Sequence, residues 1–260
     1  MFQDERCLAI LDHLKHHKRI TAEDICELFG VSRDTARRDL VKLEEEGRIV
    51  RTRGGAMLPT LLRDVPGYSN RLAAATEEKR RIGAAAASIV MDGDYILMDA
   101  STTVQCVAEQ LRAKDVSVVT NSIDIAGLLC DREVRVTMLG GSLNARHRFV
   151  YGQQAIEQLA DYRVNKLFIG ACGITADGIM NPYEEEGHLI REMMERAEQV
   201  ILLADHTKFG RSMFYRVADV GAVDKIVTDR LPDAALRQAI EAQGVELIVT
   251  DAEETEEDGI

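Results

Sequence analysis

The chain has 260 residues, of which 46% are hydrophobic, and a formal net charge of −12. It is long enough for a sizeable core, in one large domain or two smaller ones. It begins MFQDERCLAI, with acid where a signal peptide has base, and no run approaches the roughly 18 apolar residues of a membrane span. We therefore expect a cytoplasmic protein with no membrane partner. Scattered cysteines without a C-x-x-C pair, and histidines without metal-ligand spacing, predict neither disulfides nor a metal site.

Charge is distributed unevenly along the chain. Residues 1–60 hold 11 Lys and Arg against 11 Asp and Glu, so the other residues hold 21 against 33. An acidic body repels nucleic acid, so we expect any such binding from the neutral N-terminal part, where local clusters act within a Debye length of about 8 Å. Residues 252–260 are predicted to be a solvated acidic tail.

Helix signals are dense near the N-terminus. After an amphipathic stretch, ERCLAILDHLKHH, Thr21 and Asp24 have the spacing of a capping box that opens a second helix. Gly30 supplies a left-handed stop, and Ser32 is the N-cap of a third helix that ends near Glu46. Two helices joined by a short turn that contains glycine predict a helix-turn-helix.

The third helix carries a cluster of arginines in this acidic chain. Its apolar stripe is Ala36, Leu40 and Leu43, and Arg38 lies nearly opposite that stripe, with Arg33 and Arg37 on the flanks. Such arginines suit DNA phosphates and base edges. The alternative is that Arg37 and Arg38 pair with neighbouring carboxylates, at a few tenths of a kcal/mol for each pair; the carboxylates in question are Asp34 and Glu44–Glu46.

A β-hairpin and a linker are expected next. RIVRTRGGAM alternates before a Gly54-Gly55 turn, which predicts a wing and a DNA-binding domain over residues 1–57. Residues 58–76 are rich in Pro, Gly, Ser and Asn and are interpreted as a linker. Over residues 77–251 short β-branched runs alternate with helical periods, which predicts an α/β domain with a mostly parallel sheet covered on both faces.

Small polar residues follow the predicted strands. In an open α/β sheet, ligands bind beyond the carboxyl ends of the strands. The run ASTTV ends one strand and opens a helix, so it offers hydroxyls and N–H groups to an anion or phosphate, with Lys208 as countercharge from another strand end. Asp99, Asn121 and Glu185 would bind hydroxyl groups. The expected ligand is a small, phosphorylated, polyhydroxylated molecule.

These motifs resemble a known family. FGVSRDTARRDLVKLEEEGRIVRTRGGA is similar to the DNA-binding head of the DeoR family of bacterial transcriptional regulators, and DASTT, VVTNS, LGG, GACGIT and LADHTKFG are similar to its sensor domain. The resemblance implies a winged helix-turn-helix that reads operator DNA and a Rossmann-like sensor similar in fold to ribose-5-phosphate isomerase. It also implies a repressor of a carbohydrate operon, controlled by a phosphorylated sugar, and a dimer or tetramer, because operators are read as paired half-sites.

The resemblance assigns most of the site residues, and the predicted caps and strand ends add Thr21, Glu185 and Asp205. The residues expected to contact DNA are Thr21, Ser32, Arg33, Thr35, Arg37, Arg38, Arg51, Arg53, Gly54 and Gly55. Those expected to bind the effector are Asp99, Ser101, Thr102, Thr103, Asn121, Gly140, Gly141, Glu185, Asp205 and Lys208. Two departures from the family pattern make the sugar harder to identify: Ala100 replaces a common glycine, and His206-Thr207 replace the usual serines. No catalytic residue and no cofactor are expected.

Two other functions remain open at this point. One is a sugar-phosphate isomerase or hydrolase with Asp99, Glu185, Asp205 and Lys208 as acid and base groups, although an enzyme needs no DNA-binding head. The other is a protein that binds DNA constitutively and has an unused pocket, which Ala100 and His206 would explain.

Overall fold

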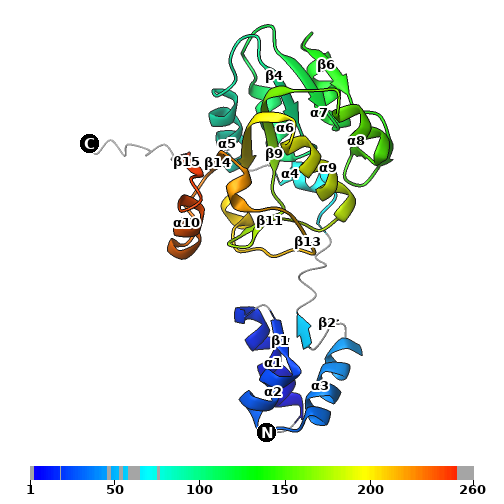
Figure 1. Ribbon diagram of the computed structural model, residues 1–260, viewed down its shortest axis with the longest axis vertical. Coiled ribbons are helices and arrows are strands. Elements are labelled where there is room, and N and C mark those ends of the chain that lie inside the picture. Colours follow the sequence, from blue (N-terminus) through cyan, green and yellow to red (C-terminus); the bar gives the residue numbers. More distant parts are fainter. Residues whose placement is uncertain are drawn as a thin grey trace, which may run out of the picture. The chain divides into compact units, whose positions relative to one another are not determined.

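The computed structural model describes residues 3–17, 19–45, 48–52, 55–57, 65–74 and 77–250 (Figure 1). The chain divides into two compact units, Met1–Arg63 and Asp64–Ile260. The predicted tail, 252–260, lies outside the described residues.

The smaller unit has the predicted helix-turn-helix and hairpin. Its elements are α1 (Gln3–His17), β1 (Arg19–Thr21), α2 (Ala22–Phe29), α3 (Arg33–Glu45), β2 (Val50–Thr52) and β3 (Gly55–Met57). Strand β1 was not predicted, because three residues are too few to show alternation. It pairs antiparallel with β3, so the sheet order is β1-β3-β2.

Local signals set the helix ends in this unit. The Thr21 hydroxyl accepts the Asp24 N–H at 3.0 Å, and the Asp24 carboxylate accepts the Thr21 N–H at 2.7 Å. This capping box begins α2, and Gly30 ends it in the left-handed conformation, with φ 63°. Both predictions are confirmed, since caps and stops depend on residues that are close in sequence.

The core of the smaller unit joins all its helices. The predicted stripe of α3 is buried against side chains of α1, α2 and β1, among them Ile10, Leu14, Ile20 and Ile25. An ion pair adds to this core: Arg6 of α1 donates to Asp39 of α3 through Nε at 2.5 Å and Nη2 at 3.0 Å, and both residues are buried. Gln3 also donates to Asp39, at 3.0 Å.

Gly55 differs from its prediction as a turn residue. It lies in β3, opposite Thr21, and is buried. A Cβ at Gly55 would come within 2.1 Å of the Ile20 carbonyl oxygen and 2.8 Å of the Thr21 Cα. Only glycine therefore allows β1 and β3 to approach this closely, while Gly54 and Arg53 lie outside the described residues.

The larger unit is built on a parallel sheet, as predicted. In the described part of the chain the sheet has seven strands, in the order β15-β14-β12-β9-β4-β5-β6. Their bounds are β4 (Tyr95–Met98), β5 (Ser117–Thr120), β6 (Arg135–Met138), β9 (Val164–Gly170), β12 (Ala197–Leu203), β14 (Lys225–Thr228) and β15 (Glu246–Val249). All neighbouring strands pair in parallel, so their carboxyl ends meet at one edge.

Helices cover both faces of this sheet (Figure 1). In β4 the alternate residues Ile96 and Met98 pack with α5 (Glu77–Ala87), α6 (Thr102–Gln110) and α7 (Ile123–Cys130). Leu97 faces the other way, toward α8 (Gln153–Leu159), α9 (Glu184–Met194) and α10 (Ala234–Glu241). Burial on both faces explains the continuous apolar runs, because each such side chain contributes about 1.5–3 kcal/mol.

Short antiparallel pieces complete the larger unit. Strands β7 (Ser142–Asn144) and β8 (Phe149–Tyr151) form a hairpin, and β10 (Gly173–Thr175), β11 (Gly178–Asn181) and β13 (Tyr215–Ala218) form a small sheet. Two short 3-10 helices, η2 (His206–Lys208) and η3 (Val220–Ala222), follow β12 and β13. The strands of the hairpin and of the small sheet were not predicted, because three or four residues carry little periodicity.

The predicted linker, 58–76, differs from the structure over its second half. Residues 65–74 belong to the larger unit and contain the helix α4 (Tyr68–Ala73). Tyr68 is buried, and Lys79 of α5 donates to the Arg71 carbonyl at 2.9 Å, which fixes the C-terminal end of α4. The turn-forming residues around α4 concealed it, because its stability comes from packing and not from propensity.

Candidate functional site

The outer face of α3 carries two arginines that are free of ion pairs within the described residues. Arg37 and Arg38 are exposed, as the helical spacing predicts, and neither pairs with Asp34 or Glu44. Glu46 and the side chain of Glu45 lie outside what the structure describes. Arg33 differs, since it pairs with Glu23 of α2. The proposed pairing of Arg37 and Arg38 with neighbouring carboxylates is therefore not seen for the described ones.

Two of the three hydroxyl residues predicted to contact DNA, Thr21 and Ser32, already serve as caps. Thr21 caps α2, and the Ser32 hydroxyl accepts the Thr35 N–H at 3.2 Å and lies 2.9 Å from the Thr35 hydroxyl. Ser32 is exposed next to the arginines. In the wing, Arg51 lies in β2, and its side chain, like Arg53, falls outside the described residues.

The carboxyl edge of the large sheet brings most of the predicted effector residues together. Asp99 follows β4 and is buried, and its carboxylate accepts the N–H groups of Ser101 and Gly170, each at 2.9 Å. These bonds tie the end of β4 to the end of β9. Burial raises the pKa of the Asp99 carboxyl to about 7. The hydrogen bond from the Gly170 N–H lowers this pKa, and the nearby carboxyl group of Glu186 raises it further.

The ASTTV run forms the expected helix start. The Ser101 hydroxyl accepts the Thr103 N–H at 3.2 Å as the N-cap of α6. Thr102 and Thr103, the first two residues of α6, are buried. A Cβ at Gly170 would lie 2.2 Å from the Ser101 hydroxyl oxygen, so Gly170 makes room for this turn. The start of α6 therefore presents N–H and hydroxyl groups beyond the sheet.

Asn121 follows β5 at the same edge. Its side-chain amide donates to the Val150 carbonyl at 3.2 Å, whereas its Oδ1 is buried with no partner in the described part of the chain. An unsatisfied buried acceptor is costly, by about 1–3 kcal/mol, so it is accounted for if a ligand donates to it.

Asp205 and Lys208 lie beyond β12. Burial raises the pKa of the Asp205 carboxyl, but Lys208, 3.6 Å away, and hydrogen bonds from Thr207 together hold it below its usual value. His206 was expected beside the pocket; its Nδ1 lies 2.6 Å from an oxygen of Asp229, which follows β14. The positive charge of Lys208 is thus partly balanced before any ligand binds.

Gly140 and Gly141, which follow β6 at the same edge, have backbone roles in the structure. Gly140 donates its N–H to the Gln158 side chain at 2.8 Å, and Gly141, with φ 142°, lies where a Cβ would meet the Tyr151 carbonyl at 2.5 Å. Both follow β6, the edge strand of the sheet. They support the β7–β8 hairpin.

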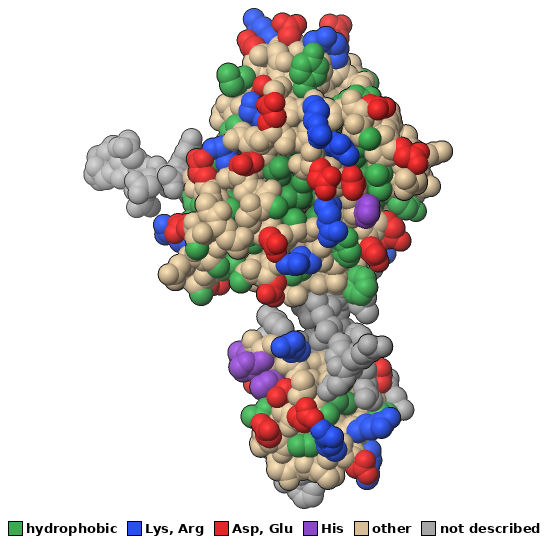
Figure 2. Space-filling view, viewed as in Figure 1, with side chains coloured by type: hydrophobic (Ala, Val, Ile, Leu, Met, Phe, Trp, Pro, Cys, Tyr) green, Lys and Arg blue, Asp and Glu red, His purple; other side chains and the backbone are tan. Residues whose placement is uncertain are grey.

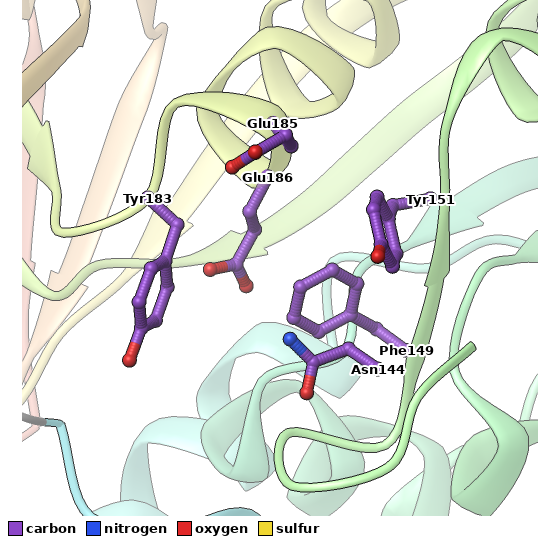
Figure 3. Close-up of a pocket in the computed structure, with 6 residues that line it drawn as sticks. All are labelled: Asn144, Phe149, Tyr151, Tyr183, Glu185 and Glu186. Carbon is purple, nitrogen blue, oxygen red and sulfur yellow. The ribbon is translucent and has the colours of Figure 1, made fainter. Parts of the chain in front are cut away.

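A pocket of about 190 Å³ lies beside this edge (Figure 3). Figure 3 shows the Glu186 carboxylate pointing toward the rings and the Asn144 amide. Burial raises the pKa of Glu186, although Arg71 and the Asn181 side chain oppose the rise. Sequence reasoning found Glu185 but missed the aromatic side chains of this pocket. They come from the β7–β8 hairpin and from the start of α9, which are distant from each other in sequence. The lining residues are Asn144, Phe149, Tyr151, Tyr183, Glu185 and Glu186.

Mutual electrostatic effects connect the pocket with the strand ends. Burial raises the pKa of the Cys172 thiol to about 12, and Glu186 and Asp99 add to the rise while Arg71 opposes it. Burial likewise lowers the pKa of Lys79, which Lys208 lowers further. Arg71 and Lys79 were both missed by sequence reasoning, since one lies in the predicted linker and the other in an ordinary helix.

Neither a membrane span nor a metal site is found within the ranges described. No helix there is long and apolar enough to cross a membrane. No group of three or more His, Cys, Asp and Glu side chains there has an arrangement that holds a metal ion. Figure 2 shows basic and acidic side chains interspersed over the face in view of the larger unit, without a basic patch.

A winged helix-turn-helix joined to an α/β unit with a polar carboxyl edge defines a DNA-binding transcriptional regulator. The chain belongs to the DeoR family. Residues 6–61 match the DeoR-like helix-turn-helix domain, and residues 74–230 match the DeoR C-terminal sensor domain. It is thus a regulator with a sensor domain and not an enzyme, which removes the isomerase or hydrolase alternative.

Two relatives agree with this assignment. The chain is 51% identical over 255 residues to the HTH-type transcriptional repressor GlcR of Bacillus subtilis (strain 168), covering 98% of this chain and 99% of GlcR. It is 31% identical over 250 residues to the glycerol-3-phosphate regulon repressor of Escherichia coli (strain K12), covering 95% and 99%. Ribose 5-phosphate isomerase A from Neisseria gonorrhoeae is 15% identical, with a TM-score of 0.38 and coverage of 50% and 52%; it carries no conclusion about activity.

Proposed function

We propose that this regulator represses a carbohydrate operon and that a phosphorylated sugar, bound at the carboxyl edge of the large sheet, controls its affinity for operator DNA. The observation that carries the proposal is the buried Asn121 Oδ1 at this edge, which has no hydrogen-bond partner among the described residues. The head is taken as residues 1–57, the connection as 58–64, and the sensor from Val65 onward to about residue 251. A dimer or tetramer in the cytoplasm would present paired heads to operator half-sites.

In the head, α3 would enter the major groove, with Arg37 and Arg38 toward phosphates and base edges. Ser32, Thr35 and Arg33 would contact the backbone beside them. Support comes from the exposure of both arginines and from the absence of a described ion-pair partner. The remaining predicted contacts are Thr21 and the wing residues Arg51, Arg53, Gly54 and Gly55.

Salt dependence tests this assignment. Arg38→Ala is expected to weaken operator binding and, if the side chain contacts a phosphate, to reduce the slope of log K against log salt by about one. Arg237→Ala is the matched control, because Arg237 is an exposed helix arginine of the larger unit that pairs with Glu241. Unchanged operator affinity for Arg38→Ala at every salt concentration would remove this residue from the interface.

In the sensor, the ligand phosphate would bind the start of α6, at Ser101, Thr102 and Thr103, with Lys208 as countercharge. Ligand hydroxyl groups would donate to Asn121 and exchange hydrogen bonds with Asp99.

Carboxylates and aromatic rings around one pocket suit the polar and apolar sides of a sugar, and this supports Glu185 as a contact. Asp205 and the two glycines, Gly140 and Gly141, would shape the site. The name of the E. coli relative contains a phosphorylated polyol, which is consistent with this ligand class.

A thermal-shift panel tests the ligand class. The panel is glycerol 3-phosphate, ribose 5-phosphate, fructose 6-phosphate and glucose 6-phosphate, each beside its unphosphorylated parent. A ligand at 100 times its dissociation constant stabilises by about 2.7 kcal/mol, which a melting curve resolves. A shift with a phosphate and none with its parent supports the proposal. No shift with any phosphate contradicts it for this panel and favours a protein that binds DNA constitutively.

Control of DNA binding requires coupling between the two sites. The ligand acts only through different affinities for the two states, so ligand and operator must weaken each other by the same factor. Calorimetric titration of the ligand with and without operator DNA measures this factor. Equal ligand affinity in both titrations would refute the control mechanism.

A further inference from the structure

One cation at the carboxyl edge, Arg71, differs from its neighbours. It lies on α4, and its guanidinium carbon is 5.6 Å from the centre of the Tyr68 ring. Tyr68 is itself buried and donates its hydroxyl to the Gln105 side chain of α6. The guanidinium thus lies over a buried ring that is hydrogen-bonded to α6, the helix whose start forms the proposed phosphate site.

Apart from the Tyr68 ring, the guanidinium of Arg71 has no hydrogen-bond or ion-pair partner among the described residues. Its Nε is buried without a hydrogen bond, and the side chain makes no ion pair there. Arg191 of α9 is a useful contrast, since it also stacks on a tyrosine, Tyr215, at 5.4 Å. It donates, however, to the carbonyls of Val217 at 2.8 Å and Arg216 at 3.0 Å. A buried donor without an acceptor is costly, and native structures rarely keep one without a reason.

The groups around Arg71 point to an anionic partner. The other two cations of this edge are already engaged: Lys79 donates to backbone carbonyls of α4, and Lys208 lies 3.6 Å from Asp205. The charge of Arg71 acts on the buried carboxyl groups of Asp99 and Glu186, yet neither lies within ion-pair distance of it. Arg71 therefore acts electrostatically on carboxyl groups of both the strand ends and the pocket, while its own Nε has no hydrogen bond.

We propose that Arg71 is an anion-binding residue of the effector site, whose guanidinium donates to the phosphate of the ligand opposite the start of α6. This rests on the proposed function and adds to it a residue from the segment interpreted as linker. A planar guanidinium matches two phosphate oxygens at once, which a lysine does not. Because α4 is the first described element after the connection to the head, the phosphate would be read at the point where the sensor begins.

The experiment compares Arg71→Met with Arg191→Met in the full-length protein. Both changes keep an unbranched apolar side chain beside a tyrosine ring and remove the guanidinium that lies over it. Affinity is measured by calorimetry for the panel phosphate that stabilises the wild type most, and for its parent sugar. We expect Arg71→Met to lose roughly 10- to 100-fold in phosphate affinity, the range for a hydrogen bond to a charged group. The ligand-free melting temperature of Arg71→Met should change little, since it loses the contact with the Tyr68 ring but no hydrogen bond or ion pair to a described residue.

The control and a second variant separate a binding role from a structural one. Arg191→Met should lower the melting temperature and leave phosphate affinity unchanged, because its bonds are internal. Arg71→Lys should bind with intermediate affinity, and it serves if the methionine variant does not fold. Wild-type phosphate affinity in Arg71→Met would overturn the proposal while the proposed function stands. If the methionine variant does not fold, wild-type phosphate affinity in Arg71→Lys would overturn it in the same way. If the wild type binds none of the four phosphates, the proposed function fails and this proposal fails with it.

Discussion

The buried ion pair between α1 and α3 makes a quantitative prediction about the head. Arg6→Met leaves the Asp39 carboxylate, which is 0% exposed, with the Gln3 amide as its remaining described donor. Removing one partner of a buried pair costs about 3–5 kcal/mol, because a charge stays buried without compensation. At 0.05–0.15 kcal/mol per residue, a unit of 63 residues has about 3–9 kcal/mol in all. The variant head is therefore expected to be near its unfolding threshold.

Hydrogen exchange resolved by segment measures this loss in the full chain. Amides of α1 and α3 should lose protection in Arg6→Met, while amides of the large sheet should not. The double variant Arg6→Met/Asp39→Leu should recover most of the protection, since well-packed apolar pairs replace buried ion pairs at little or no cost.

The ion pair between Arg33 of α3 and Glu23 of α2 serves as the control, because it also involves α3 but is exposed. Glu23→Ala removes a surface partner of Arg33 and should cost no more than about 1 kcal/mol. A loss below 1 kcal/mol in Arg6→Met, or a double variant as unstable as the single one, would refute the reasoning.

Three further predictions concern close packing and pH. Gly55→Ala should destabilise the head and abolish operator binding, since its Cβ would meet the Ile20 carbonyl oxygen at 2.1 Å; wild-type affinity in a mobility-shift assay would contradict this. Gly170→Ala should weaken binding of the panel phosphate in calorimetry without touching the ligand, because it displaces the Ser101 turn. Burial raises the pKa of Asp99 to about 7, so the native state keeps a proton that the unfolded chain loses at lower pH. This carboxyl should therefore make stability fall as pH rises from about 4 to 7, and urea titrations of Asp99→Asn should show a smaller fall over that window.

The sequence by itself determined the features that depend on neighbours along the chain. Each of these features follows from residue spacing within a single helix: the capping box of Thr21 and Asp24 and the stop at Gly30 in α2, and the outward face of Arg38 in α3. The parallel sheet was predictable because strands buried on both faces are continuously apolar. Polar residues such as Asp99 could be assigned to one edge because parallel strands end together.

Only the tertiary structure decided the features that join distant segments. The pairing of β1 with β3 explains Gly55, and the contact of Arg6 with Asp39 spans α1 and α3. The aromatic pocket combines a hairpin with the start of α9, and Tyr68 of α4, over which Arg71 lies, donates to Gln105 of α6. None of these contacts leaves a local pattern, because each is selected by the burial and hydrogen bonding of groups far apart in the chain.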